Sequence, residues 1–173
     1  MLEIGMICAE AGEKIARVSA NMAMVADMEV RASSTATTGA YSSACQRGLP
    51  AILMERGGGG RFTDSEVHAY KRDVKNIMIR MGLLSGEEVH TVQQKNVTRA
   101  EYLEAETDGL WYPVFSAGDT FAGGAVLGTV RDIWGNLLRE YRADYPGIIL
   151  YQTVGLGVKT GDPLIAYGEY VDR

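Results

Sequence analysis

The chain has 173 residues, enough for one ordinary domain or two small ones. Its hydrophobic content of 46% excludes a disordered chain. No apolar run approaches the roughly 20 residues of a membrane span, which excludes a membrane-spanning helix. The net charge is -5 and the basic residues are scattered, so we expect no nucleic-acid or membrane partner. The first residues lack the pattern of a signal peptide, and we therefore expect a cytoplasmic protein.

Cysteine and histidine are too sparse to form a recognisable metal site. Cys8 and Cys45 are far apart, and we expect buried free thiols rather than a disulfide. The histidines, His68 and His90, form no close pair, so the sequence shows no zinc-binding pattern of its own.

The first 48 residues predict a helix, a short strand, a loop and a short helix, in that order. Apolar residues recur at spacings of three and four between residues 4 and 24, as one face of a helix requires. Residues 25–31 are typical of a short strand, and the small polar residues 33–39 of a loop. Thr37 or Thr38 is placed to cap a short helix that contains Tyr41 and ends near Gly48.

Residues 49–62 are the part of the chain most suggestive of chemistry. Ala51 to Met54 form a short apolar run that predicts a strand buried on both faces, and Glu55 follows it at once. Reacting groups of α/β folds lie at the ends of such strands, and burial there raises the pKa of a carboxyl towards the range of a general base or acid. The alternative is that Glu55 is only the first solvated residue after a core strand.

Four consecutive glycines, Gly57 to Gly60, follow this glutamate. They lack the residues that accompany phosphate-binding loops, so we interpret them as a hinge that leaves a substrate room beside Glu55. Arg56 and Arg61 flank the glycines, where they are placed to bind an anionic substrate or simply to be solvated.

A helix is predicted for residues 64–81. Thr63 and Glu66 have the spacing of a capping box, Gly82 supplies a C-terminal cap, and apolar residues repeat at helical spacing between them. We expect the apolar face to pack against the sheet, with His68 on the solvated side. The apolar residues are Val67, Tyr70, Val74, Ile77, Met78 and Met81.

Helical periodicity ends near residue 90. Short β-rich pieces separated by glycines follow, at residues 110–115, 125–130, 147–153 and 163–167. Two passages with a valine and then a Gly-Asp turn, 114–120 and 158–163, suggest two related hairpins in a small barrel or flattened sandwich. We therefore expect an α/β part over residues 1–90 and a β part over residues 91–173.

Several segments, taken in order, resemble the succinylglutamate desuccinylase/aspartoacylase family, whose members are relatives of the zinc carboxypeptidases. Residues 50–58 (PAILMERGG) look like that family's strand-Glu-Gly segment, and residues 76–86 (NIMIRMGLLSG) are similar to the end of its following helix. The remaining motifs come in the family's order: AGD at 117–119, GG at 123–124, LG at 127–128, DIWG at 132–135, PGIIL at 146–150 and VKTGDPL at 158–164.

The resemblance implies a zinc-carboxypeptidase-like α/β domain followed by a small β barrel-sandwich module that narrows the mouth of the active site. It implies hydrolysis of the amide bond of a small N-acyl amino acid, with zinc polarising the carbonyl and a glutamate at the position of Glu55 moving protons. Tyr41 lies where family members can place a tyrosine that contacts substrate; the alternative is a core aromatic.

The chain departs from the family pattern because no histidine precedes Glu55, whereas the family holds its zinc with a His-x-x-Glu pair and a later histidine. The resemblance is therefore to the C-terminal half of a family member. We expect the isolated chain neither to bind zinc tightly nor to hydrolyse N-acyl amino acids. We also expect a half-sheet of this kind to self-associate through exposed strand edges.

A non-catalytic binding or assembly module with a biotinyl-like β domain is the alternative function. Carriers of that type present a lysine at the tip of a hairpin, and the corresponding residues 131–136 contain none, which counts against a carrier but not against an interaction domain.

Overall fold

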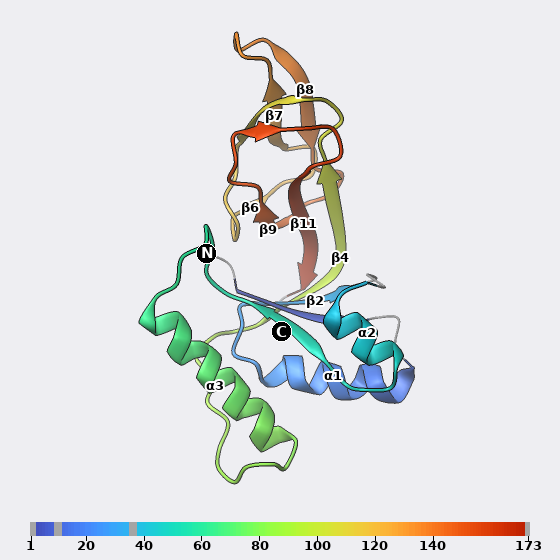
Figure 1. The fold of residues 1–173 in the computed structure, drawn as a ribbon, viewed down its shortest axis with the longest axis vertical. Coiled ribbons are helices and arrows are strands. Elements are labelled where there is room, and N and C mark those ends of the chain that lie inside the picture. Colours follow the sequence, from blue (N-terminus) through green and yellow to red (C-terminus); the bar gives the residue numbers. More distant parts are fainter. Residues whose placement is uncertain (1–2, 9–11, 35–37, 172–173) are drawn as a thin grey trace. The chain divides into compact units, whose positions relative to one another are not determined.

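The computed structural model describes residues 3–8, 12–34 and 38–171 (Figure 1). The chain divides into two compact units, the first formed by Glu3–Val97 with Val171, and the second by Thr98–Tyr170. Mixed α/β structure with two sheets is thereby confirmed. The division falls after the boundary that the composition suggests. None of the described helices is both long and apolar enough to cross a membrane.

The sheet of the first unit has the strand order β3-β1-β2-β4 (Figure 1). β1 is parallel to β2, β2 is parallel to β4, and β3 runs antiparallel to β1. Parallel neighbours need a crossover, which helix α1 supplies between β1 and β2. The strand bounds are β1 Ile4–Cys8, β2 Val30–Ser34, β3 Ile52–Glu55 and, continuing into the second unit, β4 Lys95–Glu104.

The described helices all belong to the first unit: α1 Glu13–Val25, α2 Ala40–Gln46 and α3 Asp64–Arg80. The predicted helix over residues 4–24 is wrong at its start, because residues 4–8 form a strand whose nearly continuous apolar run also fits helical spacing. The predicted strand at 25–31 lies later in the chain, at β2. Thr37 and Ala11 lie outside the described residues, as does the side chain of Cys8, whereas Cys45 is a buried free thiol as expected.

Helix α3 begins and ends where the sequence predicts. Thr63 and Glu66 form the complete capping box, and Gly82 has a φ of +72° just beyond the C-cap. The buried face differs from the predicted one, because Ala69, Asp73 and Asn76 are its buried positions. Val74, Met78 and Met81 of the predicted apolar face are exposed instead.

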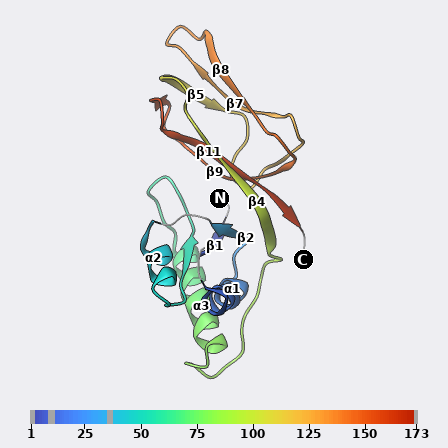
Figure 2. The ribbon, with the colours of Figure 1, turned by 90° about the vertical axis from the view of Figure 1, so that its right-hand side faces the viewer.

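The second unit contains only strands among its described residues, as predicted (Figure 2). One sheet continues from β4 in the order β4-β11-β9-β6, and the other has the order β10-β5-β7-β8. Side chains from both sheets meet in one apolar core. The strand bounds are β5 Gly109–Pro113, β6 Thr120–Phe121, β7 Val126–Arg131, β8 Leu137–Arg142, β9 Gly147–Gln152, β10 Gly157–Val158 and β11 Pro163–Val171.

The two Gly-Asp turns of this unit are built alike. The Asp119 carboxylate accepts a hydrogen bond of 2.8 Å from the Ser116 amide, and the Asp162 carboxylate accepts one of 2.8 Å from the Lys159 amide. Gly118 and Gly161 have φ values of +94° and +89°, a conformation that glycine adopts without strain. The same local geometry at both places supports the predicted relation between the two hairpins.

Candidate functional site

Strand β3, which carries Glu55, lies at the edge of the sheet in the first unit. Its residues pair with β1 in antiparallel register, with Ile52 opposite Ile7 and Glu55 opposite Ile4. The strand is half-buried along its length and exposed at Glu55, so the prediction of a strand buried on both faces is wrong. The physical reason is the edge position, which leaves one side of the strand without a neighbour.

The start of β3 is attached to two helices through Ser19 and Cys45. The Ala51 amide donates to the Ser19 hydroxyl over 3.1 Å, and the Cys45 thiol donates to the Ala51 carbonyl over 3.5 Å. Both side chains are buried, and their oxygen and sulfur atoms are 3.7 Å apart. Ser19 comes from α1 and Cys45 from α2, so these helices together set where β3 begins.

Arg56, directly after Glu55, points into the protein and not into the glycine loop. Its side chain is 1% exposed. The guanidinium donates to the Asp73 carboxylate over 2.6 and 3.1 Å and to the Asp27 carbonyl over 2.9 Å, and it forms an ion pair with Glu3. Burial acts to lower the pKa of Arg56, but the hydrogen bonds with Asp73 and Glu3 outweigh it and raise that pKa.

Asp27 is the second buried carboxylate of this network. Its side chain is 1% exposed and accepts hydrogen bonds from the Thr91 hydroxyl and amide over 2.6 and 2.8 Å. Arg72 of α3 forms an ion pair with it at 2.8 Å. Burial acts to raise the pKa of Asp27, but the Thr91 hydrogen bonds and Arg72 hold that pKa below the ordinary 3.8. The Asp27 carboxylate therefore stays charged at neutral pH.

The geometry gives Arg56 a structural role. The cavity that it lines, of about 280 Å³, is also lined by three carboxylates, Glu3, Glu29 and Glu66, and by a second arginine, Arg72, which is paired with Asp27. Carboxylates in that number do not favour an anionic ligand. Binding of substrate by Arg56 stays a prediction, whereas its ion pairs with α3 are observed.

The four glycines form a defined turn. Gly57, Gly59 and Gly60 have φ values of +73°, +61° and +70°, and the Arg61 amide donates to the Gly58 carbonyl over 3.2 Å. A Cβ at Gly57 would lie 3.0 Å from the Glu66 carboxylate, so the glycine allows helix α3 to begin close to the turn. Gly57 is therefore closely packed, whereas Gly59 and Gly60 are exposed with open space around them, and a hinge at this segment stays a prediction.

Glu55 lies directly before this turn, at the end of β3. Its carboxylate is exposed, and it makes no hydrogen bond or ion pair with any residue in the described part of the chain. Because side chains alternate along a strand, Leu53 lies on the same face of β3 as Glu55. Leu53 also lines an apolar groove of about 460 Å³ together with Tyr41 of α2. Tyr41 is half-buried in this groove, whereas Arg61 is exposed at the turn.

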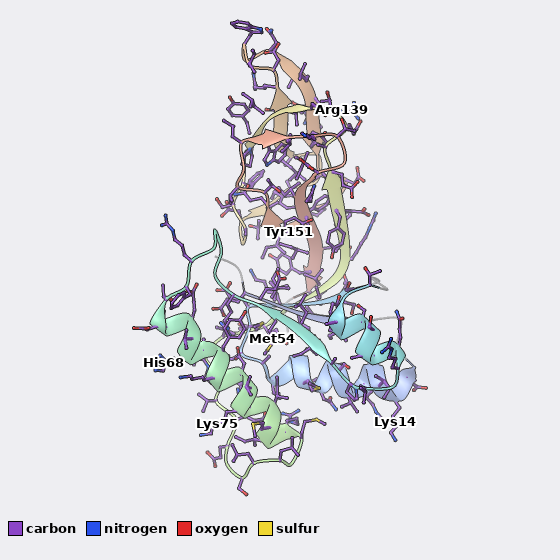
Figure 3. All side chains as sticks on the ribbon, viewed as in Figure 1. Lys14, Met54, His68, Lys75, Arg139 and Tyr151 are labelled. Carbon is purple, nitrogen blue, oxygen red and sulfur yellow. The ribbon has the colours of Figure 1, made fainter. Side chains whose placement is uncertain are left out.

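The residues for a zinc site do not come together in the described ranges. No three His, Cys, Asp or Glu side chains described by the structure are grouped so that they could hold a metal ion. The His68 ring donates a 2.6 Å hydrogen bond to the Asp64 carbonyl on its own helix, and it lies on the side of α3 turned away from Met54 of β3 (Figure 3). His90 is exposed and contacts Glu88. The residues present therefore do not fit a catalytic zinc, which needs about three protein ligands.

Solved structures share this fold over nearly the whole chain. The ectoine utilization protein EutE (DoeB) of Ruegeria pomeroyi superposes on 97% of it with a TM-score of 0.84 and 19% identity. A succinylglutamate desuccinylase/aspartoacylase of Rhodobacter sphaeroides superposes on 99% with a TM-score of 0.80 and 20% identity. The fold is that of the succinylglutamate desuccinylase/aspartoacylase proteins. The resemblance expected from the sequence is thus confirmed.

The chain spans only about half of these structures, 53% and 54% of their respective lengths. A curated relative, the N-alpha-acetyl-L-2,4-diaminobutyric acid deacetylase of Halomonas elongata, is 28% identical over 127 residues, which is 70% of this chain and 37% of the relative. No protein-family model matches the sequence. The desuccinylase/aspartoacylase fold is therefore present here in part.

Sequence reasoning found strand β3 and Glu55 at its end but missed what holds them. Asp27, Asp73 and Tyr70 contact the main chain or side chain next to Glu55, and none was a candidate. A signal was present, since Tyr70, Asp73 and Asn76 follow at helical spacing on a helix expected to pack against the sheet. Polar residues on such a face need buried partners.

Proposed function

We propose that the chain forms part of a hydrolase of the succinylglutamate desuccinylase/aspartoacylase type, which cleaves the amide bond of an N-acyl amino acid. The observation that carries the proposal is Glu55 itself, an exposed carboxylate at the end of a fixed strand in the fold of these proteins, with no polar partner among the residues that the structure describes. Glu55 would accept a proton from the attacking water and return it to the departing amine. This is general base and then general acid catalysis by one group.

An N-α-acetylated diamino acid is the first substrate to assay, because the curated relative is named for N-alpha-acetyl-L-2,4-diaminobutyric acid. The groove beside β3 would accept the apolar part of such a substrate, with Tyr41 at its wall. Arg61 is the exposed cation nearest in sequence to Glu55 and would meet the substrate's carboxylate.

Zinc belongs to this proposal through the family resemblance, and its ligands would come from residues beyond those that the structure describes. General-base assistance by itself contributes roughly 10²- to 10⁴-fold, far less than amide hydrolysis requires. We therefore expect the 173-residue chain alone to show neither stoichiometric zinc nor turnover. Zinc is measured by elemental analysis, and stoichiometric binding by this chain would contradict that expectation.

The decisive assay supplies the other half. The part of Ruegeria pomeroyi EutE that this chain does not cover is co-expressed with the chain, and hydrolysis of acetyl- and succinyl-amino acids is measured with added zinc. We expect turnover that Glu55→Gln lowers about 10²- to 10⁴-fold, leaving a measurable residual rate, and that Glu29→Gln, at an exposed glutamate of the same unit, leaves unchanged. Equal turnover in both variants would remove Glu55 from the mechanism.

A non-catalytic interaction domain is the second candidate, and one surface favours it. The hairpin turn between β7 and β8 exposes Ile133 and Trp134, which are 76% and 83% exposed. Asp132 fixes this turn through hydrogen bonds of 2.8 Å from the Trp134 and Asn136 amides. Loss of binding to a partner on Trp134→Ala, without any effect of Glu55→Gln, would favour this function over the enzyme.

We further propose a cytoplasmic protein that self-associates and binds neither nucleic acid nor membrane. The scattered basic residues and the net charge of -5 argue against binding to nucleic acid or to an anionic membrane surface. Exposed apolar side chains such as Phe62 and Trp134, at 78% and 83% exposure, support self-association. Light scattering across a concentration series tests the oligomeric state.

A further inference from the structure

The main chain on both sides of Glu55 is attached to one hydroxyl group. The Tyr70 hydroxyl accepts a hydrogen bond from the Arg56 amide over 2.9 Å and donates one to the Met54 carbonyl over 3.1 Å. A phenolic hydroxyl can donate once and accept at the same time, so a single group serves both bonds. Glu55 is the residue between these two attachment points.

The side chain after Glu55 is attached to the same helix. Arg56 is held by Asp73 of α3 over 2.6 and 3.1 Å, and its guanidinium lies 5.7 Å from the centre of the Tyr70 ring. Tyr70 and Asp73 are three residues apart and therefore neighbours on one helix face. Any shift of residues 54–56 must break at least one of these contacts.

The helix that makes these contacts is itself well anchored. Its first turn is closed by the capping box of Thr63 and Glu66, and Asn76 binds the carbonyls of Val25 and Val89 over 3.0 and 2.8 Å. Sites whose support comes from a rigid element hold their geometry better than sites on loops. A displacement of about 1 Å of a reacting group is enough to cost about 10²-fold in rate.

We propose that Tyr70 is a positioning residue for Glu55, acting through the main chain of residues 54–56 together with the Arg56–Asp73 ion pair. This inference rests on the proposed function only for the role of Glu55. The attachment itself is a property of the fold and can be tested without any turnover.

The first test is amide hydrogen exchange by NMR on the Tyr70→Phe variant, which removes only the hydroxyl. We expect the Arg56 amide to exchange about tenfold faster because it loses its acceptor, while amides in α1 and β2 stay within about twofold of the wild type. Tyr145→Phe is the matched control, since this hydroxyl of the second unit is buried and has no partner among the described residues. An unchanged Arg56 amide, or an equal acceleration throughout the first unit, would overturn the proposal.

The second test asks whether the hydroxyl acts through Glu55. In the co-expression assay, Tyr70→Phe should lower kcat about tenfold or more with KM within twofold, and it should cause no further loss in a Glu55→Gln background. Independent, multiplying effects of the two substitutions would overturn the positioning role. If Glu55→Gln were fully active, the proposed function would fail while the exchange result still decided the attachment. If no combination showed turnover, the exchange result alone would decide it.

Discussion

The two units of the chain are stabilised in different ways. In the first unit, buried or largely buried charges meet, with Arg56 and Arg72 bound to Asp73 and Asp27. In the second unit the core is aromatic: the rings of Trp111 and Tyr141 are 5.7 Å apart in an edge-to-face contact, and Tyr167 packs between Phe121 and Tyr145 at 5.5 and 5.1 Å. The charged unit is the one that carries Glu55.

This difference indicates where the fold needs a defined local geometry. Apolar and aromatic burial is non-directional and stabilises a core without fixing any one strand end. A buried ion pair adds little net stability but has a defined geometry, and its loss is severe because a charge is left unpaired. The first unit uses such pairs where the strand carrying Glu55 ends, which is where a defined geometry would matter for catalysis.

The largest expected effect is a loss of stability in the second unit, whose core is aromatic. Trp111 is 2% exposed, and a Cβ on Gly128 would come within 2.2 Å of its ring, so the indole is closely packed. We expect Trp111→Ala to destabilise the second unit by about 4 kcal/mol, the usual cost of removing a buried aromatic side chain. Amide exchange averaged over each unit measures this, and an equal loss in the first unit would show that the two units unfold as one.

The next largest expected effect is a loss of stability in the first unit, which contains the buried ion pairs. Asp73→Asn keeps the shape of the side chain but removes the charge that Arg56 pairs with, and we expect a loss of about 3 kcal/mol in the first unit. Helical circular dichroism follows this unit because every described helix belongs to it. Asp144→Asn, at an exposed aspartate of the second unit, is the control. A loss below about 1 kcal/mol would mean that the ion pair is dispensable.

Local signals in the sequence predicted the local structure. The capping box of α3, the glycine after it and the two Gly-Asp turns each depend on residues within a few positions of one another. The strand at residues 4–8 was missed because a short apolar run fits both helix and strand. Its identity is decided by pairing with β2 and β3, which are distant in the chain.

The candidate site was predictable only in part, for the same reason. Glu55 follows directly from the end of an apolar run beside glycines. Burial of Arg56 does not, because its partners Asp73 and Asp27 lie 17 and 29 residues away. An arginine beside a glycine loop looks solvated until the helix that binds it is placed.

The two units should also differ in how their stability responds to high pH. The pKa of Tyr145 is raised from 10.0 to about 12, by burial first and then by the neighbouring Tyr167. Because the pKa of Tyr145 is higher in the folded state than in the unfolded chain, its contribution to the free energy of unfolding is complete below pH 10. This contribution, roughly 2 kcal/mol, is lost as the pH rises towards 12. We expect urea midpoints of the second unit to fall over this range and Tyr145→Phe to fall less. Both tryptophans, Trp111 and Trp134, belong to this unit, so their fluorescence reports it.

Acid should act first on the other unit. The pKa of Asp27 lies below 3.8, since the Thr91 hydrogen bonds and Arg72 outweigh its burial. A lowered pKa means that the stabilisation is present above pH 3.8 and is lost as the pH falls below it through the folded-state pKa. We expect helical circular dichroism to show weakening of the first unit there, and less of it in Asp27→Asn. If the tryptophan fluorescence of the second unit changed at a higher pH than the helical signal of the first, the second unit would be the more sensitive to acid.

The smallest effect tests how far the first unit depends on the N-terminal cap of α3 at its surface. The Glu66 carboxylate accepts a 2.6 Å hydrogen bond from the Thr63 amide, and the Thr63 hydroxyl accepts one of 3.2 Å from the Glu66 amide. Thr63→Ala removes the second bond together with one of 2.8 Å from the Thr63 hydroxyl to the Glu66 carboxylate, and it should cost about 1 kcal/mol. Thr63→Ser keeps the hydroxyl and should cost about a few tenths of a kcal/mol. Urea unfolding followed at the helical signal measures both variants. A loss for Thr63→Ala as large as that for Asp73→Asn would mean that the first unit depends on α3 being formed rather than on its buried ion pairs.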